Sequence, residues 1–212
     1  MAHILITSGP TRQYLDPVRY LTNASSGRMG TALATAALEQ GHEVTIVSGP
    51  VEVDYPDAAK IIRVMTTLEM MDAAAMVFQK ADGLIGAAAP CDYMPRKVEA
   101  SKLSKTGQPL QLELIETPDI VATLGASKRS DQWVVGFALE TDDVRFRSIV
   151  KMSKKCCDMI VSNRADAMNS ENNSVEILFT DGQLLEQIDG PKLEVARGIL
   201  SWIAKRLIKE SP

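Results

Sequence analysis

The chain has 212 residues, of which 45% are hydrophobic and 24% are charged, and a formal net charge of −4. This balance suits one globular domain over residues 1–212 with a substantial core. The acidic balance gives no support to nucleic-acid or membrane-surface binding, so a polyanionic ligand would need a local cluster of cations. No N-terminal signal pattern precedes the first strand and no apolar run could span a bilayer, so we expect a cytoplasmic protein.

Short apolar runs and helical patterns alternate through the first half of the chain. The helical patterns carry apolar residues at a spacing of three or four, and the second should bury Leu68, Met71, Ala75 and Phe78. We predict helices at Arg28–Gln40 and Thr67–Gln79, and strands at His3–Thr7, His42–Val47, Ile61–Val64 and Ala81–Ala89.

The second half keeps this alternation after a loop over residues 90–108. Asp181-Gly182 is a strong hairpin signal between two strands, and Pro118 is placed at the first position of a helix. We predict helices from Pro118, at Asp142–Cys157 and at Lys192–Ile208, and strands at Leu110–Leu114, Gln132–Leu139, Met159–Val161, Val175–Thr180 and Leu184–Ile188. The pattern predicts an α/β, doubly wound, mostly parallel Rossmann-like sheet with helices on both faces and a small β-hairpin extension near the C-terminus.

The long connection Ser8–Gly30 joins the first strand to the first helix and is rich in Gly, Pro, Ser and Asn. Long loops in compact domains are commonly functional. Ser25, Ser26 and Gly27 precede the helix, where unpaired N–H groups and the helix dipole favour an anion such as phosphate. A simple helix cap is the alternative. Because one Ser would suffice for capping, we favour a phosphate-binding site.

A dinucleotide-binding oxidoreductase is the obvious competing function for such a fold. However, the first loop has no G-x-G-x-x-G, and the second strand ends in Ser48-Gly49-Pro50 where an acidic residue would bind a ribose hydroxyl. A P-loop sequence is also lacking. An NAD(P)-dependent Rossmann oxidoreductase therefore stays only as an alternative.

Five segments, in this order and spacing, resemble phosphopantothenoylcysteine synthetase, the ligase of coenzyme A biosynthesis. They read GPTRQYLDPVRYLTNASSGRMG, AAAPCDYMPRKVEASKLSK, ETPDIVATLG, VVGFALET and DMIVSNRAD. The chain looks like a stand-alone form, without the flavin-dependent decarboxylase domain. The resemblance implies that a nucleoside triphosphate, CTP rather than ATP, activates 4′-phosphopantothenate as an acyl-nucleotide before cysteine forms the amide. It also implies Mg²⁺, no flavin, and a homodimer that uses the hairpin around Asp181-Gly182 as an edge.

The resemblance assigns catalytic roles to three residues. Asn23 matches a catalytic Asn that donates to the acyl oxygen, although a helix cap is its alternative. Arg19 matches an Arg beside the reacting carboxylate. Lys102 matches the lysine of a mobile flap, for which a solvated charge run is the alternative.

The resemblance also assigns residues to nucleotide binding. Phe137 could equally belong to the core. From their place on a predicted helix alone, Lys151 and Lys155 would be interpreted as surface residues. Pro90-Cys91 departs from the small residues usual in the family, and we interpret Cys91 as filler rather than a nucleophile. With Lys102, the nucleotide-binding candidates are Gly86, Ala87, Ala88, Asp92, Pro118, Asp119, Ile120, Val121, Phe137, Lys151 and Lys155.

A third interpretation is a non-catalytic nucleotide-binding regulatory module that has kept the pocket without turnover. The presence of Asn23, Arg19 and Lys102 together argues against it, because binding alone would not need Asn23. The ligase is therefore the preferred function.

Overall fold

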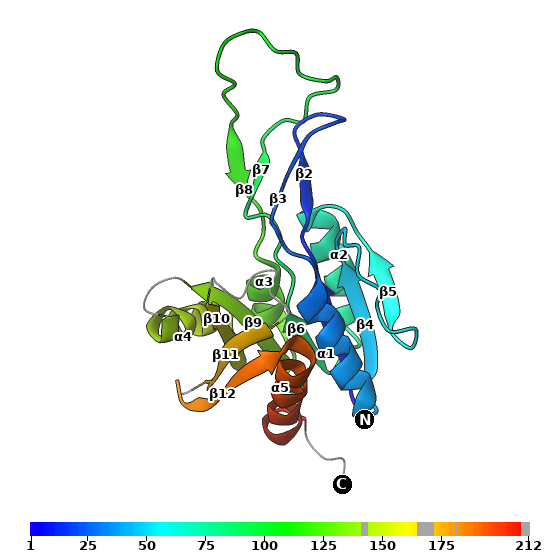
Figure 1. Ribbon diagram of the computed structural model, residues 1–212, viewed down its shortest axis with the longest axis vertical. Helices are drawn as coiled ribbons and strands as arrows, with labels where there is room; N and C mark the ends of the chain where they lie inside the picture. Colours follow the sequence, from blue (N-terminus) through cyan, green and yellow to red (C-terminus); the bar gives the residue numbers. More distant parts are fainter. Residues whose placement is uncertain (141–143, 165–171, 181, 209–212) are drawn as a thin grey trace.

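The structure of the chain is a computed structural model, which describes residues 1–140, 144–164, 172–180 and 182–208 (Figure 1). Its centre is an eight-stranded sheet in the order β12-β11-β10-β9-β6-β1-β4-β5. All neighbouring strands are parallel except β11, which is antiparallel to both β10 and β12. The predicted doubly wound, mostly parallel fold is confirmed. The strands are β1 (His3–Ser8), β4 (Glu43–Ser48), β5 (Lys60–Arg63), β6 (Gly83–Gly86), β9 (Trp133–Glu140), β10 (Met159–Arg164), β11 (Asn172–Phe179) and β12 (Leu184–Pro191).

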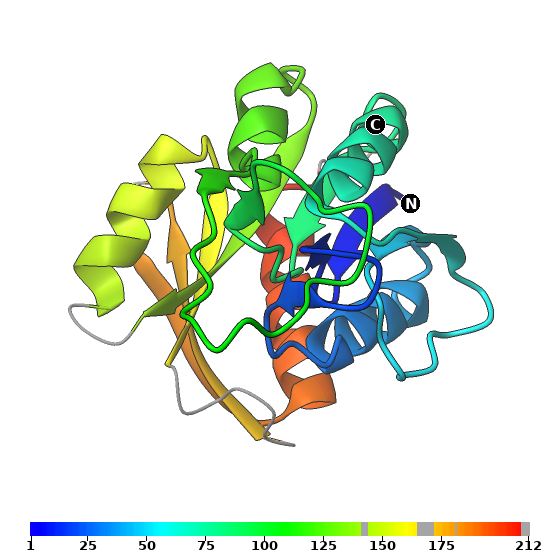
Figure 2. The same ribbon diagram turned by 90° about the horizontal axis from the view of Figure 1, so that it is seen from above.

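Helices cover both faces of this sheet, because its central strands are apolar on both sides. In β1, for example, Ile4 and Ile6 pack into one core cluster and Leu5 into the other. Figure 2 shows α1 and α5 on one face and α2, α3 and α4 on the other. The helices are α1 (Arg28–Glu39), α2 (Thr67–Phe78), α3 (Ile120–Ser127), α4 (Val144–Lys154) and α5 (Lys192–Arg206).

Helix α2 begins with a capping box, in which the Thr66 side chain and the Glu69 side chain each accept from the other's main-chain N–H. The predicted buried stripe of this helix is only partly right, since Leu68 is 46% exposed. Met70 is fully buried instead. The spacing of apolar residues fits two neighbouring faces of α2, and packing against β1 and β4 selects the face that carries Met70.

A projecting arm, formed by residues 12–22 and 93–116, stands above the sheet (Figure 1). It contains two antiparallel pairs, β2 (Arg12–Tyr14) with β3 (Tyr20–Thr22) and β7 (Tyr93–Pro95) with β8 (Leu114–Glu116). The predicted strand Leu110–Leu114 is wrong except for its last residue. Pairing with β7 starts only at Leu114, and the preceding residues are exposed.

The predicted C-terminal hairpin is confirmed as the antiparallel pair β11 and β12. Gly182 has a positive φ of 78°, which suits its place in the connection, whereas Asp181 lies outside the described residues. The predicted start of a helix at Asp142 also lies outside them, and the described helix α4 begins at Val144.

The carboxyl ends of β1, β6, β9 and β10 meet at one edge of the sheet, since these strands are parallel. Strand β12 also ends there, because two successive antiparallel pairings give it the direction of β10. Helices α1 and α5 therefore both begin at this edge, which is where ligands are expected in such folds. The arm rises from the same edge (Figure 1).

Candidate functional site

Two cavities lie at the carboxyl edge. The α3 pocket, of about 330 Å³, is lined by Thr7, Gly86, Ala88, Pro90, Cys91, Asp92, Tyr93, Glu116, Thr117, Pro118, Asp119, Ile120, Val121, Phe137 and Lys155. The α1 pocket, of about 460 Å³, is lined by Asn23, Ala24, Ser25, Ser26, Gly27, Arg28, Met29, Gly30, Ala87, Ala88, Ala89, Pro90, Asp92, Phe137, Ala138, Leu139, Lys151, Asn163, Asn173 and Lys192. The pockets share Ala88, Pro90, Asp92 and Phe137, so they are neighbouring parts of one site.

The start of α1 presents unpaired N–H groups to the α1 pocket. Gly27 is the N-cap with a φ of 76°, and no side chain accepts a hydrogen bond from the first turn. Neither Ser25 nor Ser26 therefore caps the helix with its side chain, and the alternative of a simple helix cap is wrong. An uncapped helix start is suited to an anion.

Gly30 allows α1 to lie directly against β1. A Cβ at this position would lie 2.0 Å from the Ser8 Oγ, so a larger residue would push the helix start away from the strand. The Ser8 hydroxyl also accepts a hydrogen bond from Tyr55 at 2.9 Å. Close packing at Gly30 thus fixes the position of the Gly27 turn at the carboxyl edge.

Asn23 does not cap α1. Its Nδ2 donates to the main-chain oxygens of Ala89 at 3.2 Å and Pro90 at 2.9 Å, and the side chain lines the α1 pocket. These bonds join the Ser8–Gly30 connection to the loop after β6. The carboxamide thus lies where the two halves of the site meet.

Buried hydroxyl groups hold the loop that carries Asp92. Thr11 and Thr67 are both fully buried and hydrogen-bonded to each other at 2.8 Å. Thr11 accepts from the Cys91 N–H at 2.9 Å, while Thr117 donates to the Cys91 oxygen at 2.6 Å. The main chain at Cys91 is therefore fixed from both sides, which places Asp92 between the pockets.

The Cys91 thiol itself is packing material. Its side chain is buried, and this burial raises its pKa, with the nearby Asp92 charge acting in the same direction. A raised pKa disfavours the thiolate that a nucleophile would need. The interpretation of Cys91 as filler is consistent with this environment.

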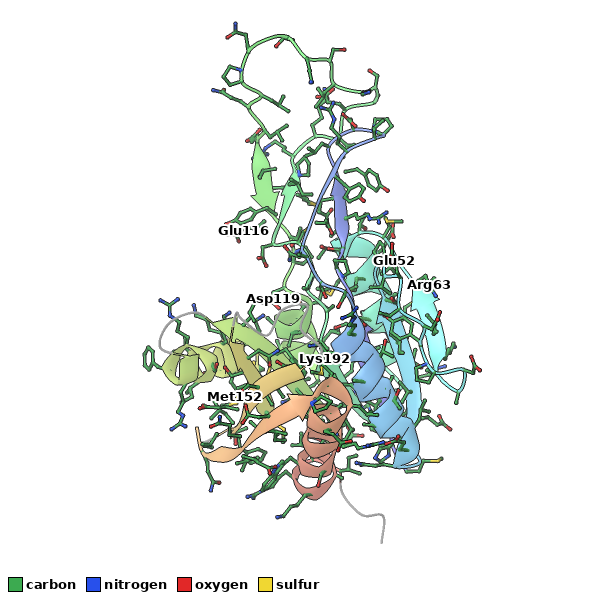
Figure 3. All side chains as sticks on the ribbon, viewed as in Figure 1. Glu52, Arg63, Glu116, Asp119, Met152 and Lys192 are labelled. Atoms are coloured by element: carbon green, nitrogen blue, oxygen red, sulfur yellow. The ribbon has the colours of Figure 1, made fainter. Side chains whose placement is uncertain are left out.

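The α3 pocket is bounded by the start of its helix. Asp119, not Pro118, forms this start, because its carboxylate accepts a hydrogen bond from the Ala122 N–H at 3.0 Å. The prediction of Pro118 at the first helical position is therefore wrong by two residues. The other oxygen of Asp119 lies 3.1 Å from the Lys155 Nζ, which brings the α4–β10 connection to this pocket (Figure 3 labels Asp119).

Arg19 and Lys102 line neither pocket among the described residues. Arg19 pairs with the buried Asp16 at 2.6 Å and donates to the Leu103 oxygen at 2.6 Å. Asp16 also accepts from the Leu103 N–H at 3.1 Å. Lys102 is exposed, on the long loop of the arm. The structure thus ties the loop beside Lys102 to the turn between β2 and β3.

Burial alone would raise the pKa of Asp16, but its hydrogen bonds outweigh that effect. The N–H groups of Val18 and Leu103 and the side chain of Arg19 donate to it and lower the pKa well below the ordinary value. Asp16 is therefore ionised at neutral pH. It acts as a charged anchor for the turn that holds Arg19.

The structure brings most of the sequence-predicted site residues together. Those lining the pockets are Asn23, Ser25, Ser26, Gly27, Gly86, Ala87, Ala88, Asp92, Pro118, Asp119, Ile120, Val121, Phe137, Lys151 and Lys155. Sequence reasoning missed Arg28, Asn163, Asn173 and Lys192. Lys192 follows Pro191 at a helix start, where a lysine is unfavourable beside the helix dipole. This unfavourable placement was the signal in the sequence that could have identified it.

No helix in the described part of the chain is long and apolar enough to cross a bilayer. No group of three or more His, Cys, Asp or Glu side chains there is placed to hold a metal ion.

The chain is similar to proteins of coenzyme A biosynthesis. It is 40% identical over 207 residues to the coenzyme A biosynthesis bifunctional protein CoaBC of Bacillus subtilis, covering 95% of this chain and 51% of that protein. The corresponding protein of Escherichia coli K12 is 40% identical over 198 residues, covering 90% and 49%. The chain thus spans about half the length of these curated relatives.

Solved structures share the fold. The crystal structure of the C-terminal domain of CoaBC has a TM-score of 0.83 and 36% identity, with 97% of each chain covered. A Cab2 mutant in complex with phosphopantothenate-cysteine has a TM-score of 0.78 and 14% identity, covering 96% of this chain and 87% of that one, a likeness of fold alone. The model of the DNA/pantothenate metabolism flavoprotein C-terminal domain matches residues 1–207. The chain therefore belongs to the family of the DNA/pantothenate metabolism flavoprotein C-terminal domain, the family of the C-terminal part of CoaBC.

Proposed function

We propose that this chain is a ligase of coenzyme A biosynthesis, which joins 4′-phosphopantothenate and cysteine into 4′-phosphopantothenoylcysteine. The observation that supports this most directly is the joined pair of pockets. One end has an uncapped helix start suited to phosphate, the other is lined by the segment Pro118–Val121, and Asn23 lies where the loops of the site meet. Family membership and these pockets together favour nucleotide-dependent activation of a carboxylate.

The reaction has two steps. A carboxylate oxygen of phosphopantothenate attacks the α-phosphorus of a nucleoside triphosphate, and pyrophosphate leaves. The amino group of cysteine then attacks the acyl carbon, and the nucleoside monophosphate leaves with the bridging oxygen. We infer CTP rather than ATP as the co-substrate, from the likeness to bacterial CoaBC.

In this mechanism Asn23 donates from its carboxamide to the acyl oxygen on which negative charge develops. A donor aimed at the oxygen on which charge develops lowers the barrier strongly. An amide also adds no charge beside the carboxylate. The Asn23 amide donates to the main-chain oxygens of Ala89 and Pro90, which line the same pocket. One of these hydrogen bonds would be replaced by a hydrogen bond to the substrate.

The nucleotide is assigned to both pockets, across the wall that they share. Pro118–Val121 and Phe137 would hold base and ribose, Gly86–Ala88 would allow close approach, and Lys151 and Lys155 would reach the nucleotide. The α-phosphate would lie near Asp92, and the remaining phosphates near Ser25, Ser26 and Gly27.

Mg²⁺ would accompany the triphosphate. This ion is commonly held by one or two carboxylates together with substrate phosphates, so a single side chain such as Asp92 in the shared wall fits it. When bound, Mg²⁺ would neutralise charge on the phosphates. Repulsion between the carboxylate and the triphosphate would fall accordingly.

We assign Lys102 to a flap that closes over the reacting groups, and Arg19 to the carboxylate of a substrate. Both lie in the arm, above the carboxyl edge, and Lys102 is exposed on the long loop of the arm. Closure of the flap would exclude water from the acyl-nucleotide.

A cytoplasmic location and a single domain over residues 1–212 stay predictions.

We also infer a homodimer. The arm carries exposed apolar side chains, among them Val18, Tyr93, Leu110 and Leu112. Exposed apolar side chains gathered on one projecting segment favour a protein interface there. The hairpin edge β12, which the sequence suggested, instead exposes Glu186, Gln187 and Asp189. Because charged edges resist strand pairing, we favour the arm as the dimer surface.

The test of the proposed function is turnover of 4′-phosphopantothenate and cysteine with CTP or ATP, without added flavin or NAD(P)H. We expect release of pyrophosphate and CMP in equal amounts with product, and slower turnover with ATP. Pyrophosphate release with phosphopantothenate alone would report the acyl-nucleotide step. Failure to release pyrophosphate with any nucleoside triphosphate would instead support a non-catalytic binding module.

A further inference from the structure

Two helices that are distant in sequence begin side by side at the carboxyl edge. Helix α1 starts at Arg28 and α5 starts at Lys192, and the two helices pack against each other on the same face of the sheet. Both first residues line the α1 pocket. Figure 3 labels Lys192 at the start of α5, beside α1.

The start of α5 is electrostatically unfavourable in the free protein. Burial lowers the pKa of Lys192, and the neighbouring positive charge of Arg28 lowers it further. Neither side chain forms an ion pair with a carboxylate in the described parts of the chain. Neither helix has a side-chain cap, so their dipoles add positive potential to the same corner. An anion bound there would relieve this repulsion.

The two pockets differ in charge, and the difference is greatest at this corner. The α3 pocket is lined by Asp92, Glu116 and Asp119, and its Lys155 is paired with Asp119. The described lining of the α1 pocket contains three cationic residues, Arg28, Lys151 and Lys192, and one acidic residue, Asp92. A phosphate-bearing ligand would therefore direct its charge toward α1 and α5.

Asn163 gives independent evidence that the α1 pocket is built for a polar ligand. Its side chain lines the pocket, and its Oδ1 is enclosed without a hydrogen-bond partner among the described residues. An enclosed polar atom without a partner is costly in a folded protein. The Oδ1 accepts hydrogen bonds, so a ligand that carries a hydroxyl or N–H group as well as its phosphate would satisfy it.

We propose that Lys192, together with Arg28, forms a phosphoryl-binding subsite of the α1 pocket. The inference rests on the proposed function, which supplies two ligands of this chemistry. One is the β,γ-diphosphate of the nucleotide, which becomes the pyrophosphate leaving group, and the other is the phosphate of 4′-phosphopantothenate. The Lys192 ammonium provides a point charge and the Arg28 guanidinium a planar fork, and both suit phosphate oxygens.

Direct binding tests this subsite without reference to turnover. Calorimetric titrations would compare inorganic pyrophosphate, CMP, CTP, 4′-phosphopantothenate and pantothenate on the wild type, Lys192→Gln and Arg28→Gln. The matched control is Lys205→Gln, in the last turn of the same helix, away from the pocket. We expect Lys192→Gln to weaken its phosphoryl ligand by about tenfold to a hundredfold, the scale of a charged hydrogen bond, and Lys205→Gln to leave it unchanged.

The pattern across ligands identifies which phosphoryl group binds. Weaker pyrophosphate and CTP binding with unchanged CMP and phosphopantothenate assigns the subsite to the leaving group. Weaker phosphopantothenate binding with unchanged pantothenate and CTP assigns it to the pantothenate phosphate. Unchanged affinity for every phosphorylated ligand in both Lys192→Gln and Arg28→Gln would overturn the proposal, even in an enzyme that turns over normally.

Thermal unfolding separates ligand binding from a structural role. Because the Lys192 charge is disfavoured in the free protein, Lys192→Gln should unfold at a temperature equal to or above that of the wild type. Its unfolding temperature should also rise less than that of the wild type when the ligand identified by the titrations, pyrophosphate or 4′-phosphopantothenate, is added. A variant that unfolds at a lower temperature than the wild type, and is stabilised as much as the wild type by both ligands, would show that Lys192 is structural and would contradict the subsite.

Discussion

Asn23 joins the two loops of the site through a single carboxamide, which donates to Ala89 and Pro90. In Asn23→Asp the side chain keeps its size but loses both N–H donors and places a negative charge beside two carbonyl oxygens. We expect amide-forming turnover to fall by at least about 10²-fold, the scale of losing one oxyanion donor. Nucleotide affinity should persist, because the residues assigned to base and ribose are untouched. Steady-state kinetics and nucleotide titration together measure both effects.

Asn23→Ser provides the control for this substitution. It removes the carboxamide without adding a charge, so a similar loss of turnover would attribute the effect to the missing donor. A much smaller loss would attribute it to repulsion by the carboxylate. If Asn23→Asp retained near-normal turnover, Asn23 would have no part in the mechanism.

At the scale of elements, a buried carboxylate helps to hold the arm loop. Asp16 accepts from the Leu103 N–H, and its partner Arg19 donates to the Leu103 oxygen. In Asp16→Asn the ion pair is lost, and an amide in place of one oxygen would oppose the Leu103 N–H. We therefore expect faster tryptic cleavage after Lys102 and Lys105, both of which are exposed. Time courses of limited proteolysis, read by mass spectrometry, measure this release.

The matched control for the loop is Glu99→Gln. Glu99 pairs with Lys97 in the same loop, but this pair is exposed, and exposed ion pairs contribute little. Its cleavage rate should equal that of the wild type. Equal cleavage rates for Asp16→Asn and the wild type would mean that the loop is held by other contacts, and the anchoring role of Asp16 would be wrong.

The elements of the sheet could be predicted from the sequence, whereas the strands of the arm could not. Strands such as β1 are buried on both faces and form apolar runs in the sequence, and α1 is followed by Gly41, whose φ of 78° suits a residue just after a helix. By contrast, β2, β3 and β7 each have three residues and lack a clear alternation. Such short strands exist because their partners hold them, so local sequence carries little signal.

The candidate site shows a similar division. Residues in contiguous motifs, such as Ser25–Gly27, could be assigned because the glycine pattern and the helix start lie together in the sequence. Lys192 could not, since it joins the site only through the packing of α5 against α1. The buried contacts of Thr11 and Thr67 were likewise invisible, because they link residues 56 positions apart.

At the scale of the whole molecule, the distribution of exposed apolar surface is uneven. The arm carries Tyr93, Leu110 and Leu112 with exposed fractions of 50%, 57% and 39%. A monomer would leave these side chains in water above the site, at a cost that burial against a second copy would recover. Dimerisation through the arm would also bring a second chain next to the loop that carries Lys102.

Two matched leucines distinguish the arm from the hairpin edge as the dimer surface. Leu112 lies in the arm and Leu184 on β12, and their exposed fractions are 39% and 37%. Burying a carboxylate without a partner in an interface is strongly unfavourable. We therefore expect Leu112→Glu to be monomeric at concentrations where the wild type is dimeric, and Leu184→Glu to stay dimeric. Light scattering after size-exclusion chromatography measures both masses. The reverse result would place the interface at β12, as the sequence first suggested, and a monomeric wild type would exclude the homodimer altogether.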